Sequence, residues 1–236
     1  MAITIANLTS NFDNTDSQTY NTASVTPGAN RLVLVAVGIR NYNAANLGTI
    51  SLSGNGLTWV EIATTTYSTV ASGKSRISIF RSMGASPSAG AITITVSGSG
   101  NASCQWSVDE ADGVDTTGTN GSGAVVQNAT NQSDNCTSGL TVTLAALADA
   151  ANNAVYAAFG TDDARNLTEG SGYTELAAPV GEDALESQYK VPGTTTPSAT
   201  NFASFGDGAG IAIEIKAAAG GVVIPVFMRQ YRQRWA

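Results

Sequence analysis

Four acidic residues, Asp109, Glu110, Asp112 and Asp115, form the cluster in this chain best suited to chemistry. Paired carboxylates perform glycoside hydrolysis, and carboxylate oxygens are the ligands that Ca²⁺ prefers. Their spacing follows no calcium-loop pattern, however, and Gly113 among them is typical of a turn. We interpret the cluster as a solvated acidic loop after a strand. A calcium site and a glycan-active enzyme that uses Asp109, Glu110 or Asp115 are the alternatives.

The chain contains no histidine. It therefore lacks the commonest general base and the commonest transition-metal ligand, and neither a Ser-His-Asp nor a Cys-His arrangement can form. Asp162-Asp163 is interpreted as a solvated turn. We predict a protein that is not an enzyme, with no catalytic residue, no cofactor and no metal site. Tyr42, Trp59 and Tyr67 are candidates for a sugar-stacking platform if they are exposed.

The composition predicts an all-β fold that must position these residues. Charged residues make up only 12% of the 236 residues. Their place is taken by small polar and turn-forming residues, whereas β-branched residues recur in short runs, and this mixture disfavours helices. Periodicity and apolar runs predict strands at 31–39, 50–52, 77–80, 92–96, 140–144, 155–159 and 211–215. We interpret 144–151, the one helix candidate, as a strand end and a turn.

The order of motifs indicates that the chain consists of two similar halves, at about 18–115 and 139–218. Gly54-Asn55-Gly56 and the strand after it resemble Gly170-Ser171-Gly172 and its strand, and an aromatic–basic pair and a Pro-Ser-Ala loop then follow in both. We expect each half to supply four or five antiparallel strands, which together form one β-sandwich of jelly-roll type at 1–218. Two separate small sandwiches are the alternative. The stretch 116–138, rich in Gly, Asn, Ser and Thr, is the nearest feature to a divider.

The last residues, 219–236, differ from the rest. The net charge is −7, and without Arg229, Arg232 and Arg234 residues 1–228 carry 8 basic and 18 acidic residues. An acidic body with a basic tail argues against nucleic-acid binding by the body and indicates a separate role for the tail. We predict a linker followed by an anchoring tail. Its partner-binding residues are Val222, Val223, Ile224, Phe227, Arg229, Tyr231, Arg232, Arg234 and Trp235.

Neither a signal peptide nor a membrane span is apparent in the sequence, so we expect synthesis in a cytoplasm and no membrane partner. The two cysteines, Cys104 and Cys136, fit free buried thiols in that compartment. A disulfide between them, closing a loop of about thirty residues, is the alternative, because sequence position does not decide between the two.

The segments 26–37, 113–115 and 212–217 resemble a duplicated, jelly-roll-like β-sandwich module of tailed-phage virion proteins and some bacterial surface proteins. The resemblance covers about 18–218 and leaves the tail outside. It implies a structural role on the virion surface, synthesis in the host cytoplasm and no catalytic residues. We expect a capsid decoration (cement) protein that binds other virion proteins, the major capsid protein first, through its tail. We further expect a homo-oligomer, with a trimer by analogy. A carbohydrate- or receptor-binding module of a tail fibre or adhesin is the alternative.

Overall fold

A computed structural model describes residues 2–42, 47–67, 74–203 and 206–219. It confirms the predicted all-β fold of antiparallel sheets. Within these ranges the only helix is a short 3-10 turn, Ser122–Ala124, and none is long and apolar enough to cross a bilayer. All nine residues predicted to bind a partner, from Val222 to Trp235, lie outside the described residues.

Each half of the chain forms eight strands. The first half contains β1 (Thr4–Asp13), β2 (Thr19–Asn21), β3 (Leu32–Asn41), β4 (Ile50–Ser53), β5 (Val60–Tyr67), β6 (Lys74–Ser82), β7 (Thr93–Val96) and β8 (Asn101–Asp112). The second contains β9 (Val125–Ser133), β10 (Leu140–Thr141), β11 (Ala154–Thr161), β12 (Thr168–Glu169), β13 (Thr174–Ala177), β14 (Ala184–Lys190), β15 (Ser198–Thr200) and β16 (Gly208–Ile215).

The two halves have the same topology, strand for strand. In the first half, a five-stranded sheet of order β1-β8-β3-β6-β5 accompanies a three-stranded sheet of order β2-β7-β4. In the second, β9-β16-β11-β14-β13 accompanies β10-β15-β12. Eight strands in two sheets, with the first strand paired to the last, is a jelly-roll arrangement. A β-bulge also recurs at the equivalent place, between Glu61 and Ala63 and between Glu175 and Ala177.

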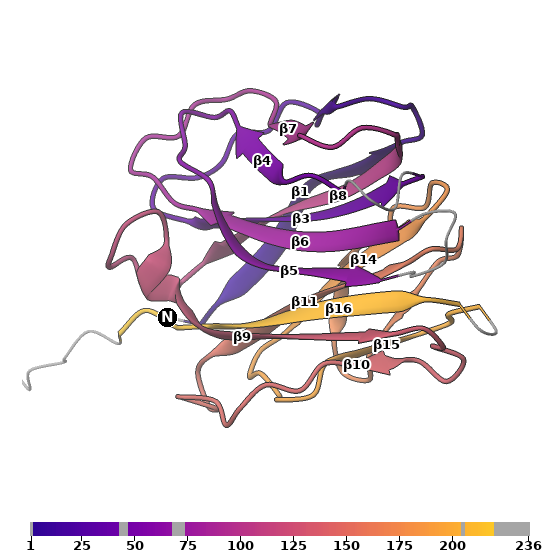
Figure 1. Ribbon diagram of the computed structural model, residues 1–236. Helices are drawn as coiled ribbons and strands as arrows, with labels where there is room; N and C mark the ends of the chain where they lie inside the picture. The colour runs from indigo at the N-terminus through magenta and orange to yellow at the C-terminus, as the bar shows by residue number, and fades with distance from the viewer. Residues whose placement is uncertain (1, 43–46, 68–73, 204–205, 220–236) are drawn as a thin grey trace, which may run out of the picture.

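The four sheets stack as four layers with three apolar cores between them (Figure 1). The two five-stranded sheets face each other in the middle, and each three-stranded sheet covers the outer face of its own partner. Strand β3 explains why the sequence run 31–39 is apolar at nearly every position. Leu34 and Ala36 enter the central core while Val33 and Val35 enter the core of the first half, so both faces are buried.

This arrangement combines the two that the sequence left open. The five-stranded sheets bury their faces against each other, as expected for one sandwich, and each half is also a complete sandwich of its own. Two of the strands that the sequence did not predict are long and lie at the edges of the five-stranded sheets. Strand β1 precedes the expected start of the first half, and β9 lies in the stretch 116–138 that resembled a divider, because its polar residues suit an edge strand. Strand β10 is shorter than the run 140–144 predicted.

An approximate twofold axis relates the halves. Strand β5 contacts β9 and β1 contacts β13, which are equivalent contacts when β1 to β8 are matched in order with β9 to β16. The contacts of β16 with β6 and of β14 with β8 form a second equivalent pair. The chain therefore packs its halves as the two subunits of a symmetric dimer pack, with the same surface used twice.

Candidate functional site

The four clustered acids do not share a site. Asp109 and Glu110 are neighbours on β8, so their side chains lie on opposite faces of the sheet. Asp112 lies at the surface 3.3 Å from the Arg31 guanidinium. Asp115 pairs with Lys216 at 2.7 Å, and hydrogen bonds from Lys216 and Thr117 lower its pKa to about 2. The paired carboxylates that a glycosidase needs are therefore not assembled from these residues.

Asp109 is fully buried between the two halves. Its carboxylate accepts hydrogen bonds from the Asn7 amide at 2.8 Å, the Ser107 hydroxyl at 2.9 Å and the Tyr156 hydroxyl at 2.8 Å. Burial raises the pKa of Asp109 to about 6, although these hydrogen bonds act in the opposite direction. Tyr156 comes from β11, so Asp109 joins the first half to the second.

Asp183 belongs to no motif that was predicted from the sequence. It is a second buried acid between the halves, and it comes from the second half, whereas Asp109 comes from the first. Arg40 and Ser75 of the first half donate to its two oxygens at 2.9 and 2.7 Å. Burial raises the pKa of Asp183 to about 6, and the bonds from Ser75 and Arg40 offset only part of that shift. Its partners lie more than a hundred positions away in the sequence, so no local pattern could have identified it.

Glu110 and Glu214 perform the same structural task in the two halves. Val33 pairs with Glu110 across the first sheet and Val155 pairs with Glu214 across the second, so the two acids are equivalent. Each binds the loop that precedes the central strand of its half. Glu110 accepts from the Gly28 amide and from Arg31. The Glu214 carboxylate accepts from the Ala148 amide, from Asn153 and from Gln127, each at 2.7 Å.

The remaining candidates also lie apart. Asp162 follows β11 in a turn and accepts the Asp207 amide at 3.0 Å, which ties this turn to the segment that precedes β16. Of the three aromatic candidates, Tyr42 is 55% exposed and bonded to Glu182, whereas Trp59 packs against the core of the first half and Tyr67 is buried in the central core. The three do not form one stacking platform.

Glu186 is a buried acid that the sequence did not single out. Neither of its carboxylate oxygens has a hydrogen-bond partner among the described residues. Burial raises its pKa well above the ordinary range, and the nearby acids Glu175 and Glu169 raise it further. In the described part of the chain, no three Cys, Asp or Glu residues are grouped so that they could hold a metal ion.

Both cysteines are free thiols, and they lie in different cores. Cys104 belongs to the core of the first half and Cys136 to that of the second, so the alternative of a disulfide between them is wrong. Burial raises the pKa of both thiols. Since the thiolate is the reactive form, neither residue has the character of a nucleophile.

We predict that neither thiol reacts with a maleimide reagent in native buffer and that both react after denaturation without a reductant. Intact mass before and after labelling measures this directly. A denatured, unreduced sample that takes up no label would contradict the free-thiol assignment, and labelling of the native protein would contradict the burial.

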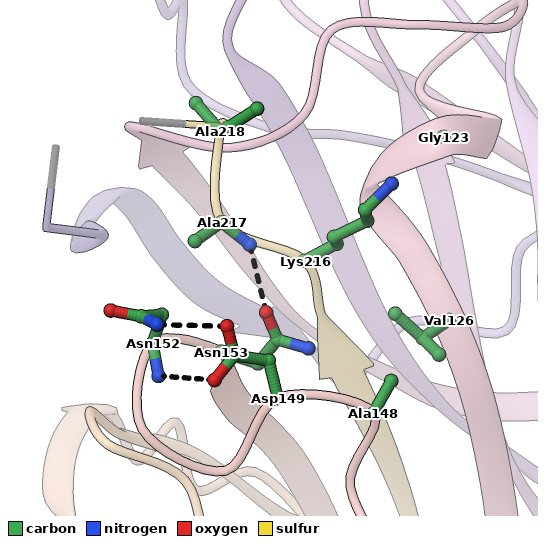
Figure 2. Close-up of a pocket in the computed structure, with 10 residues that line it drawn as sticks. Gly123, Val126, Ala148, Asp149, Asn152, Asn153, Lys216, Ala217 and Ala218 are labelled. Atoms are coloured by element: carbon green, nitrogen blue, oxygen red, sulfur yellow. Dashed lines mark hydrogen bonds between the residues drawn. The ribbon is translucent and has the colours of Figure 1, made fainter. Parts of the chain in front are cut away.

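A pocket of about 640 Å³ lies near Ala219, where the described residues end. Figure 2 shows its lining residues gathered around the end of β16. Gly123 comes from the 3-10 turn and Val126 from the start of β9. Ala148, Asp149, Asn152 and Asn153 come from the loop before β11, and Lys216 to Ala219 from the chain after β16. Its volume is within the range of ligand-binding pockets. Val126 is 40% exposed, one of three large apolar side chains exposed to that degree among the described residues.

Hydrogen bonds fix the walls of this pocket. The Asn153 side chain accepts the Ala217 amide at 3.1 Å and donates to Glu214 at 2.7 Å, so one buried acid holds both the loop and, through Asn153, the chain end. Asp149 accepts from the Asn152 side chain at 2.8 Å, which closes the loop on itself (Figure 2). The sequence showed the small-residue linker Ala217-Ala218-Ala219 but not the pocket, because the walls come from three separated segments.

The acids among the sequence-predicted candidates thus mainly bind other parts of the fold. In the sequence, the predicted partner-binding residues begin at Val222, shortly after Ala219, the last residue that lines the pocket. Val126, Asp149, Asn152 and Lys216 are the lining residues that sequence reasoning missed. Comparison of the chain with protein-family models, with curated proteins and with solved structures gives no match.

Proposed function

We propose that this chain is a non-enzymatic structural protein that attaches to a larger assembly through residues 220–236. The observation that carries the proposal is the pocket beside Ala219, the last described residue before the tail. Lys216 to Ala219, the residues that directly precede this segment in the sequence, line the pocket. The buried acids support the same proposal, because Asp109, Asp183 and Glu214 all bind other parts of the fold.

The resemblance to duplicated sandwich modules of tailed phages makes the virion the proposed assembly. In this role the chain is a capsid decoration (cement) protein on the virion surface, made in the host cytoplasm. The tail carries three arginines and three aromatic residues, a combination that suits recognition of carboxylates and of apolar pockets on a partner. The major capsid protein is the proposed partner, and a homo-oligomer, a trimer by analogy, is the proposed state on the particle.

Deletion of residues 220–236 tests the attachment. We expect particles of the phage that encodes the chain to contain it in a fixed ratio to the capsid protein. The chain that ends at Ala219 should melt at the same temperature as the full chain but be missing from the particles. Quantitative mass spectrometry of purified particles measures the ratio, and light scattering gives the oligomeric state of both forms. Full occupancy by the truncated chain would exclude the tail as anchor, and absence of the full chain from particles would exclude the virion role.

A further inference from the structure

Glu186 on β14 is directed into the core between the two sheets of the second half. Its neighbours face the central core, where Leu185 packs and the Ser187 hydroxyl donates to Ser107 at 3.0 Å. Successive residues of a strand face opposite ways, so Glu186 lies on the face that the sheet β10-β15-β12 covers. It is 0% exposed, and its carboxylate oxygens have no hydrogen-bond partner in the part of the chain that the structure describes.

Two further acids face the same layer. Glu169 of β12 pairs with Ala199, which is buried in the core of the second half, and direct partners of an antiparallel pair share a face. Glu175 of β13 pairs with Gln188, which lies on the same face of β14 as Glu186. Strand β12 contacts both β13 and β14. Three carboxyl groups from three strands are therefore directed to one place beneath the cover.

The surroundings of Glu186 disfavour its ionised form. Burial raises its pKa well above the ordinary value of 4.5. Three acids raise this pKa further, namely Glu175, Glu169 and, from the far side of the sheet, Asp109. Lys190, the basic residue on this face of β14, lies instead over the Tyr173 ring, 5.5 Å from its centroid. An ionised carboxylate here would have neither water nor a donor to compensate its charge.

The equivalent position of the first half carries a small hydroxyl. Ser78 of β6 matches Glu186, because each pairs with the residue four positions after the equivalent valines, Val33 and Val155. The Ser78 hydroxyl donates to the Thr64 hydroxyl at 2.8 Å. The position is therefore neutral and hydrogen-bonded in the first half, and a buried acid without a partner is specific to the second.

The cover above Glu186 is held by short strands. Strands β10, β15 and β12 contain two, three and two residues, whereas β14 beneath them contains seven. The Gln188 side chain ties the cover to β14, because it donates to the Ser198 carbonyl and accepts the Gly170 amide, both at 2.9 Å. Segments with few backbone hydrogen bonds open locally at a lower free energy than the whole domain.

We propose that Glu186 is a pH-sensitive latch of the second half, in which ionisation of its carboxyl group opens the sheet β10-β15-β12 from β14 and admits water to the core beneath. The carboxyl ionises more readily in the open form, where water reaches it. Opening therefore becomes more favourable as the pH rises above 4.5 and levels off at the raised pKa. This property of the body goes beyond attachment through the tail and does not depend on it.

Hydrogen exchange in the full-length protein tests the latch. The sheet β2-β7-β4 is the internal control, because it is the equivalent cover of the first half and lies over Ser78 instead of Glu186. We expect the protection factors of amides in β10-β15-β12 to fall about tenfold or more, relative to those in β2-β7-β4, between pH 5 and pH 8. Labelling times scaled to the intrinsic exchange rate remove the ordinary effect of pH. Peptide mass spectrometry measures both sheets in one sample.

Three substitutions separate Glu186 from its surroundings. Glu186→Gln removes the titrating group and should abolish the relative fall in protection. Glu175→Gln removes a neighbour that raises the pKa of Glu186, so the relative fall should become smaller. Glu61→Gln is the matched control, because Glu61 precedes the β-bulge of the first half as Glu175 precedes that of the second. It should leave the relative fall as it is in the parent.

Each outcome decides the proposal. Equal falls in the two covers of the parent would overturn it, because the pH effect would then not arise at Glu186. A relative fall that persists in Glu186→Gln would overturn it as well. If Glu186→Gln does not fold, the Glu175 variant decides, and a relative fall as large as that of the Glu61 variant would exclude the latch.

Discussion

Glu214→Ala is expected to lower the free energy of unfolding by about 3 kcal/mol or more, because it leaves three hydrogen-bond donors without their acceptor. The Ala148 amide, the Asn153 side chain and the Gln127 side chain all converge on this fully buried carboxylate. Water does not replace the lost acceptor easily at a site with no exposed surface. Denaturant titration followed by circular dichroism measures the change.

Glu110→Ala is the matched control, because Glu110 occupies the equivalent place in the first half. Its partner Arg31 has a side chain that is 43% exposed and can turn to water and to Asp112. We expect a loss of only about 1 kcal/mol for this variant. If the two substitutions lowered the free energy of unfolding equally, the exposure of the hydrogen-bond partners would not determine the size of the loss. A Glu214 variant as stable as the parent would contradict the assigned role of this residue.

The second large effect is a fall in stability as the pH rises from about 4 to about 7. Asp109 and Asp183 have an ordinary pKa of 3.8, and burial between the halves raises the pKa of each to about 6. The folded protein therefore binds more protons than the unfolded chain between these values. Their favourable contribution is complete below pH 4 and lost above pH 6, and each carboxyl accounts for about 3 kcal/mol. Unfolding free energies at pH 4.5 and 7.5 measure the fall.

The Asp109→Asn variant isolates the contribution of Asp109 to this pH dependence of stability. We expect this variant to flatten the pH dependence by about 3 kcal/mol, since an amide does not titrate in this range. Asp112→Asn, near the exposed end of the same strand, should leave the slope as it is. A slope that is the same in both variants would show that Asp109 does not titrate in this window. A rise in the free energy of unfolding between pH 4.5 and 7.5 would contradict the raised pKa assigned to Asp109 and to Asp183.

The sequence predicted those elements whose signal is local. The run 31–39 was identified as a strand buried on both faces, and β3 has that burial because it lies between two apolar cores. The repeated Gly-rich turn identified the duplication. Strand β9 escaped detection because Gln127, Asn128 and their polar neighbours suit an edge strand and a loop equally.

The functions of individual acids were less predictable, because they depend on partners that are distant in the chain. Asp109 and Glu110 looked like a cluster, yet strand alternation directs them to opposite faces. Asp183 stood out in no pattern, and Glu214 was noted only as part of the segment 212–217, although both are buried and bind other parts of the fold. The tail was recognised by composition alone, and its predicted contacts with a partner remain predictions.

The approximate twofold axis has a consequence for the surfaces that the two halves expose. Two identical copies of such a half would present every surface site twice, once on each side of the axis. In this chain, positions that the axis relates carry different residues: Arg31 binds Glu110 in the first half, whereas Asn153 binds Glu214 at the equivalent place in the second. The backbone is therefore nearly symmetric while the surface is not, and a partner that recognises one half meets different side chains on the other.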